Sequence, residues 1–210
     1  VGDPTCSIKD CVSILVVVSP LAPDEFPFMP KIQGVRLAVG KTNIRYHDRN
    51  DLMVAKFAAG TRVAGVYTRS LTASAPVEWC REALRGGQAE VLVVNSGNAN
   101  AFTGKAGHAS VKRTVEATAA LFSCRPSEVF IASTGIIGEP LPDSKLTAIL
   151  PTVVDTLKEN NWEKAAQSIL TTDTFAKGAS RTANIGGTQV TINGIAKGSG
   201  MIAPDMATML

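Results

Sequence analysis

Four segments of the sequence carry polar or glycine-rich residues where a simple hydrophobic core would not need them. They are residues 95–100 (NSGNAN), 133–135 (STG), 171–174 (TTDT) and 197–210 (KGSGMIAPDMATML). In the second segment, Gly135 would let a ligand approach the backbone, and Thr134 adds a hydroxyl donor. Two donors directed at one point can stabilise a developing oxyanion. Taken alone, the same three residues are more typical of an ordinary turn after a strand.

The third and fourth segments are also open to two interpretations. Hydroxyl and carboxylate side chains such as those of residues 171–174 commonly cap helices and turns. Lys197 lies among small residues, where a lysine can bind a carboxylate, tune a nucleophile or remain a solvated loop residue. Residues 198–210 are small and apolar, whereas chain ends are more often polar. We therefore expect this last segment to belong to a core rather than to a frayed terminus.

The elements that must position these residues follow from hydrophobic patterning. It predicts strands over residues 34–39, 62–68, 89–95, 128–132 and 189–192, with a turn at residues 186–187 before the last strand. Helical spacing predicts helices over residues 111–122, 146–157 and 162–169, with Pro151 kinking the second or dividing it into two. Prolines punctuate residues 1–30, which predicts an irregular arm. The mixed order of elements predicts an α/β (α+β) class for residues 31–210, without a further domain boundary.

Composition excludes several classes of protein. The chain has 210 residues, 45% of them hydrophobic, and a net charge of +3 from 21 basic and 18 acidic residues. This balance argues against a dedicated nucleic-acid binder and against disorder. The longest apolar run near the start, residues 12–18, is far shorter than the ~20 residues of a membrane helix. The four cysteines form no C-x-x-C pair, so we expect no zinc site, no disulfide framework and a reducing compartment.

Residues 197–210 resemble the autoprocessing segment of the ornithine acetyltransferase family, also called the bifunctional glutamate N-acetyltransferases of arginine biosynthesis. Three other segments match the same family in order: residues 95–104 (NSGNANAFTG), 132–138 (ASTGIIG) and 169–174 (ILTTDT). Residues 63–69 and 75–77 are weaker matches. The resemblance begins near residue 30 and extends to the end of the sequence, while residues 1–30 match nothing familiar.

The resemblance implies a precursor that cleaves itself between Ala207 and Thr208 by an N-to-O acyl shift. The new N-terminal Thr208 would be the nucleophile, and its free α-amino group, with an ordinary pKa of about 8, would act as its base. This chemistry needs no histidine. The resemblance further implies that Thr134 and Gly135 form an oxyanion hole. It implies that Thr171, Lys197 and Thr208 bind substrate.

The implied reaction is a ping-pong transfer of an acetyl group from N-acetylornithine to Thr208 and then to glutamate. Some family members also use acetyl-CoA as the donor, and no cofactor or metal is implied. The implied fold is a layered α/β sandwich, shared with a β chain from the same precursor and assembled as an α2β2 heterotetramer. We expect a cytoplasmic location, or the mitochondrial matrix in a eukaryote.

One departure and two alternatives accompany this interpretation. A mature α chain should stop at Ala207, but this sequence continues to Leu210. We therefore expect either an uncleaved fragment or part of a larger chain, with further site residues in the β chain. The enzymatic alternative is a related self-processing aminopeptidase, although those carry a serine nucleophile. The other alternative is a non-catalytic fragment that binds amino acids. In that case the full-length protein would never cleave itself before Thr208.

Overall fold

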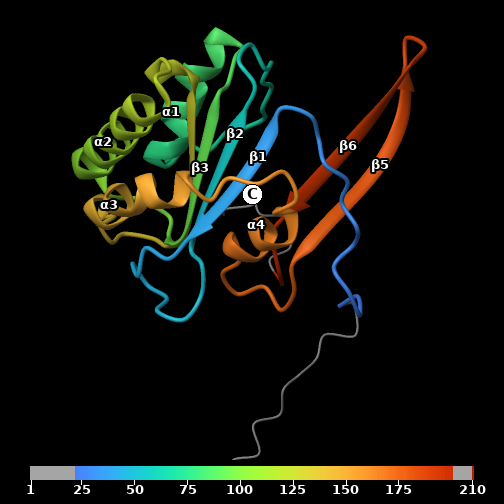
Figure 1. The fold of residues 1–210 in the computed structure, drawn as a ribbon. Coiled ribbons are helices and arrows are strands. Elements are labelled where there is room, and N and C mark those ends of the chain that lie inside the picture. The colour runs from blue at the N-terminus through green and yellow to red at the C-terminus, as the bar shows by residue number, and fades with distance from the viewer. Residues whose placement is uncertain (1–21, 201–209) are drawn as a thin grey trace, which may run out of the picture.

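The computed structural model describes residues 22–200 and residue 210. Its centre is a four-stranded mixed sheet between two outer layers (Figure 1). The strands are β1 (Val35–Gly40), β2 (Leu52–Phe57), β3 (Val91–Asn98) and β4 (Val129–Ile136), in that spatial order. The pairs β1–β2 and β2–β3 are antiparallel, whereas β3 and β4 are parallel. The predicted mixed α/β class is therefore correct.

One outer layer consists of three helices, α1 (Ala75–Ala83), α2 (Gly104–Phe122) and α3 (Asp143–Val154). Every second strand residue faces this layer, as the two-residue period of a strand requires. Val54 of β2 and Val93 of β3 thus join Val115 of α2 and Leu146 of α3 in one buried cluster. Helices and sheet are held together by this burial.

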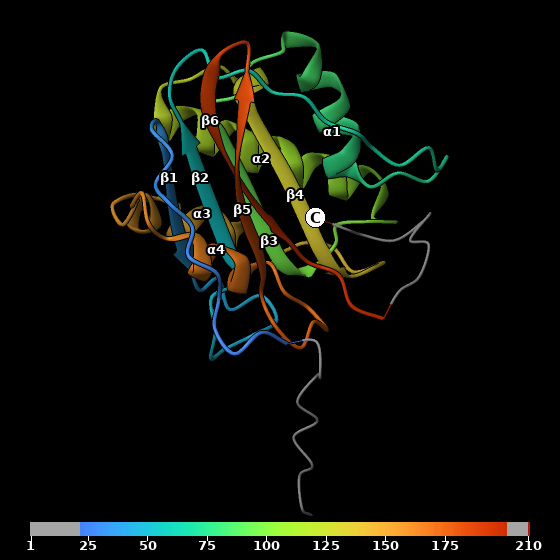
Figure 2. The ribbon, with the colours of Figure 1, turned by 90° about the vertical axis from the view of Figure 1, so that its right-hand side faces the viewer.

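The opposite face of the sheet is covered by helix α4 (Trp162–Ser168) and by the hairpin of β5 (Lys177–Ile185) and β6 (Thr188–Ala196). Leu37, Met53 and Val94, which alternate with the residues of the first face, pack here against Ala165 of α4. Figure 2 shows the hairpin crossing in front of the sheet. The predicted turn is confirmed, because Gly186 and Gly187 have φ angles of 58° and 83°, which suit a two-residue hairpin loop.

Most of the predicted elements are confirmed, namely the strands over residues 34–39, 89–95, 128–132 and 189–192 and the helices over residues 111–122 and 162–169. The strand predicted over residues 62–68 is wrong. Only Arg62 forms a bridge, to Gln88, and Val66 is 99% exposed. A pattern that would suit a strand remains a loop where no neighbouring strand pairs with it.

The helix predicted over residues 146–157 is also corrected. It is one helix, α3, that begins at Asp143 and ends at Val154, and it is not divided at Pro151. A proline this close to the last turn removes one backbone hydrogen bond with few helical residues left to disturb. Within residues 22–200, no helix is both long and apolar enough to cross a membrane.

Candidate functional site

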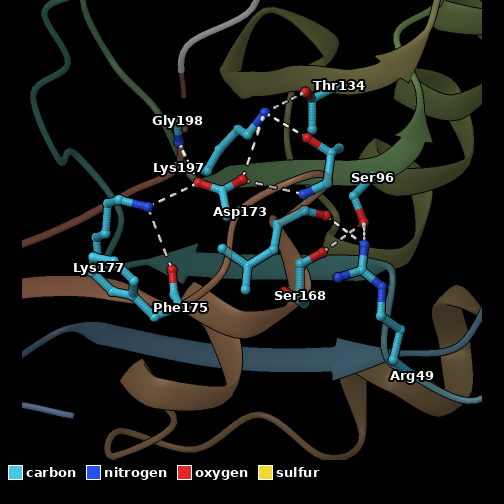
Figure 3. Close-up of polar contacts among 11 residues, drawn as sticks. Arg49, Ser96, Thr134, Ser168, Asp173, Phe175, Lys177, Lys197 and Gly198 are labelled. Carbon is cyan, nitrogen blue, oxygen red and sulfur yellow. Dashed lines mark hydrogen bonds and ion pairs between the residues drawn. The ribbon is translucent and has the colours of Figure 1, made fainter. Parts of the chain in front are cut away.

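The candidate site lies where the parallel strands β3 and β4 end. In their register Ser96 pairs with Thr134, and Gly97 pairs with Gly135. Parallel strands place their carboxyl ends at the same edge of a sheet, which is where α/β proteins commonly bind ligands. The loop after α4 and the end of β6 come to this same edge (Figure 3).

Lys197 is the centre of this arrangement. Its Nζ donates to Thr171 Oγ1 at 2.8 Å and to Thr134 Oγ1 at 3.3 Å. An ammonium group can only donate, so both threonine oxygens act as acceptors and their own hydrogens can point elsewhere. Thr134 and Lys197 are buried, with 1% and 7% of their surface exposed. The structure therefore brings together three residues that the sequence singled out: Thr134, Thr171 and Lys197.

Asp173 is a site residue that the sequence analysis treated only as part of a capping segment. Its Oδ1 accepts from the backbone N–H of Gly198 at 2.6 Å and from Lys177 Nζ at 3.0 Å. Its Oδ2 accepts from the backbone N–H of Thr171 at 3.3 Å and lies 3.9 Å from Lys197 Nζ. The carboxylate thus joins the loop after α4 to the chain that leaves β6. The signal in the sequence that could have identified Asp173 is its place in a short polar loop, four residues before Lys177.

The electrostatics of the cluster follow from burial and from these contacts. Burial alone would raise the pKa of the Asp173 carboxyl, but hydrogen bonds from Gly198, Lys177 and Thr171 hold it below its ordinary value. Burial lowers the pKa of Lys197, Asp173 opposes that effect, and the charge of Lys177 adds to it. Lys197 is therefore a desolvated ammonium with a nearby counter-ion.

Gly135 permits the close approach of the two parallel strands. Its φ angle is 134°, in a region that L side chains rarely adopt. A Cβ at this position would lie 2.3 Å from the carbonyl carbon of Gly97 and 2.6 Å from the nitrogen of Asn98. The glycine is therefore required by the backbone, whatever role its N–H has in catalysis.

The amide-rich segment 95–100 holds the ends of strands β3 and β4 in place beside the site. Strand β3 continues to Asn98, beyond the end predicted at residue 95, with an irregular register at Gly97 and Asn98. Asn95 accepts from Ser133 Oγ at 2.6 Å, and Asn98 accepts from the N–H of Asn100 at 2.7 Å. These buried amides are satisfied within the chain, so they hold the strand ends in place rather than present free groups to a ligand.

Arg49 ties the end of β3 to the end of α4. Its Nη2 donates to the carbonyl of Leu170 and, at 3.4 Å, to Ser96 Oγ (Figure 3). Ser96 Oγ in turn donates to the carbonyl of Ser168 at 2.8 Å. The guanidinium also lies 3.7 Å from the centre of the Tyr46 ring. The loop that carries Thr171 and Asp173 is thereby fixed against the sheet.

A cavity of about 240 Å³ lies between β4, α1 and the loop before α1. Its lining includes Ser133, Cys80 and Leu210. Leu210 also accepts a hydrogen bond from the backbone N–H of Lys197 at 2.9 Å, so the cavity adjoins the lysine cluster. Burial raises the pKa of the Cys80 thiol, which donates to the carbonyl of Ile131. Cys80 is thus a packing group here rather than an activated nucleophile.

Two of the predicted site residues, Ala207 and Thr208, lie outside the described residues. Among residues 22–200 and 210, no group of three or more histidine, cysteine, aspartate or glutamate side chains could hold a metal ion.

Comparison with known proteins points to one family. The sequence profile of the ArgJ family matches residues 36–210. The arginine biosynthesis bifunctional protein ArgJ of Mesorhizobium japonicum is 55% identical over 193 residues, which are 92% of this chain and 47% of that protein. The ArgJ of Bradyrhizobium diazoefficiens matches with the same identity and coverage. The chain therefore spans about half the length of these curated relatives.

Two crystal structures are similar to the fold described here. The ArgJ structure from Bacillus halodurans aligns with a TM-score of 0.76 and 30% identity, covering 85% of this chain and 92% of that one. Ornithine acetyltransferase from Mycobacterium tuberculosis, complexed with ornithine, aligns with a TM-score of 0.74 and 34% identity, covering 85% and 93%. The two solved chains are thus about as long as this chain, whereas the curated relatives are about twice as long.

Proposed function

Because this chain belongs to the ArgJ family, we propose that it is the N-terminal part of an acetyltransferase of arginine biosynthesis. The observation that carries the proposal is the convergence of Lys197, Thr134 and Thr171 at one edge of the sheet. Leu210, two residues after Thr208 in the sequence, is hydrogen-bonded to Lys197 at the same place. A hydroxyl pair and a buried ammonium suit the recognition of a substrate carboxylate beside an acyl-transfer centre.

The first step of the proposed chemistry is cleavage of the bond between Ala207 and Thr208. The Thr208 hydroxyl attacks the carbonyl carbon of Ala207, the C–N bond breaks, and the released nitrogen takes up the hydroxyl proton. Water then hydrolyses the resulting ester, leaving a carboxylate on Ala207 and a free hydroxyl and amine on Thr208. The lengths of the two solved relatives support such processing, because their chains are about half as long as the curated relatives.

The second step is acetyl transfer. Thr208 Oγ attacks the acetyl carbonyl of N-acetylornithine while its α-amine takes the hydroxyl proton. The Thr134 hydroxyl, whose hydrogen is not engaged by Lys197, and the Gly135 N–H donate to the oxyanion. On collapse of the intermediate the C–N bond breaks, and the α-ammonium gives its proton to the departing amine of ornithine. The amine of glutamate then attacks the acetyl ester and passes a proton to the α-amine. The bond to Thr208 Oγ breaks, Oγ takes back that proton, and N-acetylglutamate leaves. Lys197 and Thr171 hold the substrate carboxylate in both halves of the reaction.

The remaining parts of the proposal concern the whole protein. A β chain that begins at Thr208 completes the site, and the two chains assemble as an α2β2 heterotetramer in the cytoplasm. The reaction needs no cofactor, and acetyl-CoA serves as an alternative donor substrate. The ornithine in the Mycobacterium tuberculosis structure supports the assignment of the substrate class.

Thr134→Ala is expected to lower kcat for acetyl transfer by about 10²–10³, since one donor to the oxyanion is lost. Thr134→Ser keeps the hydroxyl and is the matched control, expected to retain most of the rate. Steady-state kinetics with N-acetylornithine and glutamate measure both variants in the full-length protein. Equal rates for Thr134→Ala and the wild type would show that the oxyanion assignment is wrong.

The experiment that tests the proposed function is intact mass determination with N-terminal sequencing of the full-length protein. Two chains are expected, the second beginning Thr208-Met209-Leu210. A single uncleaved chain would instead favour the fragment that only binds amino acids. Release of free acetate without glutamate, in place of transfer to glutamate, would favour the related self-processing aminopeptidase, which hydrolyses amides.

A further inference from the structure

Asp173 occupies an unusual position between two lysines and two backbone amides. Each carboxylate oxygen faces one backbone N–H and one ammonium group: Gly198 and Lys177 on Oδ1, Thr171 and Lys197 on Oδ2. The side chain of Asp173 has no exposed surface, and that of Lys197 is 8% exposed. Figure 3 shows the carboxylate between the two lysines.

The topology explains why these groups meet. The start of β5 and the end of β6 are neighbours in the hairpin, where Lys177 pairs with Ala196. Lys197 therefore follows directly after the residue opposite Lys177. Asp173 lies in the loop that connects α4 to β5, and it spans the 25 positions to Gly198 with a 2.6 Å hydrogen bond. One carboxylate thus fixes two chain segments that approach the site from different directions.

The donors of Lys197 are only partly used by the protein. Of its three hydrogens, two are donated to Thr134 and Thr171. Asp173 Oδ2, at 3.9 Å, is an ion-pair partner beyond hydrogen-bond distance. No described residue therefore accepts the third hydrogen, and the cluster of two ammonium groups and one carboxylate has one positive charge in excess. A carboxylate ligand would satisfy both the spare donor and the excess charge.

We propose that Asp173 is a positioning residue, which fixes the Thr171 loop to the end of β6 and keeps the Lys197 ammonium charged and aimed at a substrate carboxylate. This inference rests on the proposed function for the identity of the ligand, but not for the state of Lys197. Asp173 does not touch the reacting atoms. It acts through Lys197.

The charged groups around Lys197 determine in which direction each substitution should shift its pKa, and these directions can be tested. Asp173 faces it from the loop after α4 and Lys177 from β5, while β4 and residue 171 contribute only the hydroxyls of Thr134 and Thr171. Removing the negative charge of Asp173 should lower the pKa of Lys197, and removing the positive charge of Lys177 should raise it. A purely structural carboxylate would not predict shifts of opposite sign in the two variants.

The test measures two properties of the full-length protein in Asp173→Asn, Lys177→Met and the control Asp143→Asn. Asp143 is also a well-buried carboxylate, but it pairs with Arg113, at 2.7 Å, away from the site. The first property is the pH at which KM for glutamate begins to rise on the alkaline side. We expect this limb to move to lower pH in Asp173→Asn, to higher pH in Lys177→Met, and to remain in place in Asp143→Asn.

The second property is independent of acetyl transfer. Cyanate reacts with neutral amines, so the rate of Lys197 carbamoylation, followed by mass spectrometry against pH, reports its protonation. At pH 8, Asp173→Asn should react severalfold faster, because a lower pKa leaves a larger fraction of the Lys197 side chain neutral. Unchanged carbamoylation in both Asp173→Asn and Lys177→Met would overturn the proposal. If the wild type transfers no acetyl group but the carbamoylation shifts appear, the proposed function fails and the role of Asp173 stands.

If Asp173→Asn fails to fold, the variant Lys177→Met can still decide the question. Lys177→Met keeps an aliphatic stem at a side chain that is one-third exposed. It removes the charge together with the hydrogen bonds to Asp173 and to the carbonyl of Phe175. Slower carbamoylation of Lys197 in this variant supports the proposed cluster, and an unchanged or faster reaction contradicts it.

Discussion

Thr208→Ala in the full-length protein is expected to abolish both self-cleavage and acetyl transfer. The same hydroxyl is proposed to attack the Ala207 carbonyl during processing and the acetyl carbonyl during turnover, and alanine has no oxygen to do either. Denaturing gel electrophoresis with intact mass checks the first effect, and transfer from N-acetylornithine to glutamate checks the second.

Thr208→Ser is the matched control, because it keeps the hydroxyl and loses only a methyl group. It should cleave and transfer at reduced but measurable rates. A protein with Thr208→Ala that still separates into two chains would place the cleavage elsewhere. One that stays whole but transfers acetyl groups normally would contradict the free-amine mechanism.

Gly135→Ala should prevent the protein from accumulating in folded form. The added Cβ would meet the Gly97 carbonyl carbon at 2.3 Å, and both atoms belong to paired backbones that cannot move independently. Together with the strained φ of 134°, we expect a loss of about 4 kcal/mol or more, at the upper end of single substitutions. Soluble yield and the midpoint of urea unfolding measure the effect.

Gly138→Ala separates the clash from the backbone strain. Gly138 also has a positive φ, of 85°, but a Cβ there would meet no atom within 4 Å. This control should lose only about 1–2 kcal/mol, the cost of a left-handed conformation for a residue with a side chain. Equal stability of the two variants would show that the strands can separate to admit a Cβ.

The central parts of the fold could be predicted from the sequence because their patterns are strong. Strand β3 is a continuous β-branched run, and helix α2 repeats apolar residues at helical spacing. Strand β2 was missed because Leu52, Met53, Val54 and Ala55 are all buried. Both faces of this strand are covered by an outer layer, so its sequence shows no alternation of apolar and polar residues. Strand β5 contains few β-branched residues and exists because β6 pairs with it along its whole length.

Helix α1 was missed although its signals were present. Ser74 stands at the N-cap position and a proline at the start of the helix, both of which favour helix initiation. In the site, motif order indicated Thr134, Thr171 and Lys197, which the structure brings together. The role of Asp173 depends on a contact with Gly198 across a hairpin, and local sequence carries no information on such a contact.

The proposed cleavage would change what the hydrogen bond from the Lys197 N–H to the Leu210 carbonyl connects. Before the proposed cleavage it closes a loop within one polypeptide, and afterwards it joins two separate molecules. Leu210 also packs against the apolar cluster beneath the sheet, so the contact does not stand alone. The newly made end would thus be tethered from its third residue, at a high effective concentration beside the lysine, without a covalent link. Cleavage would create the catalytic amine without releasing it.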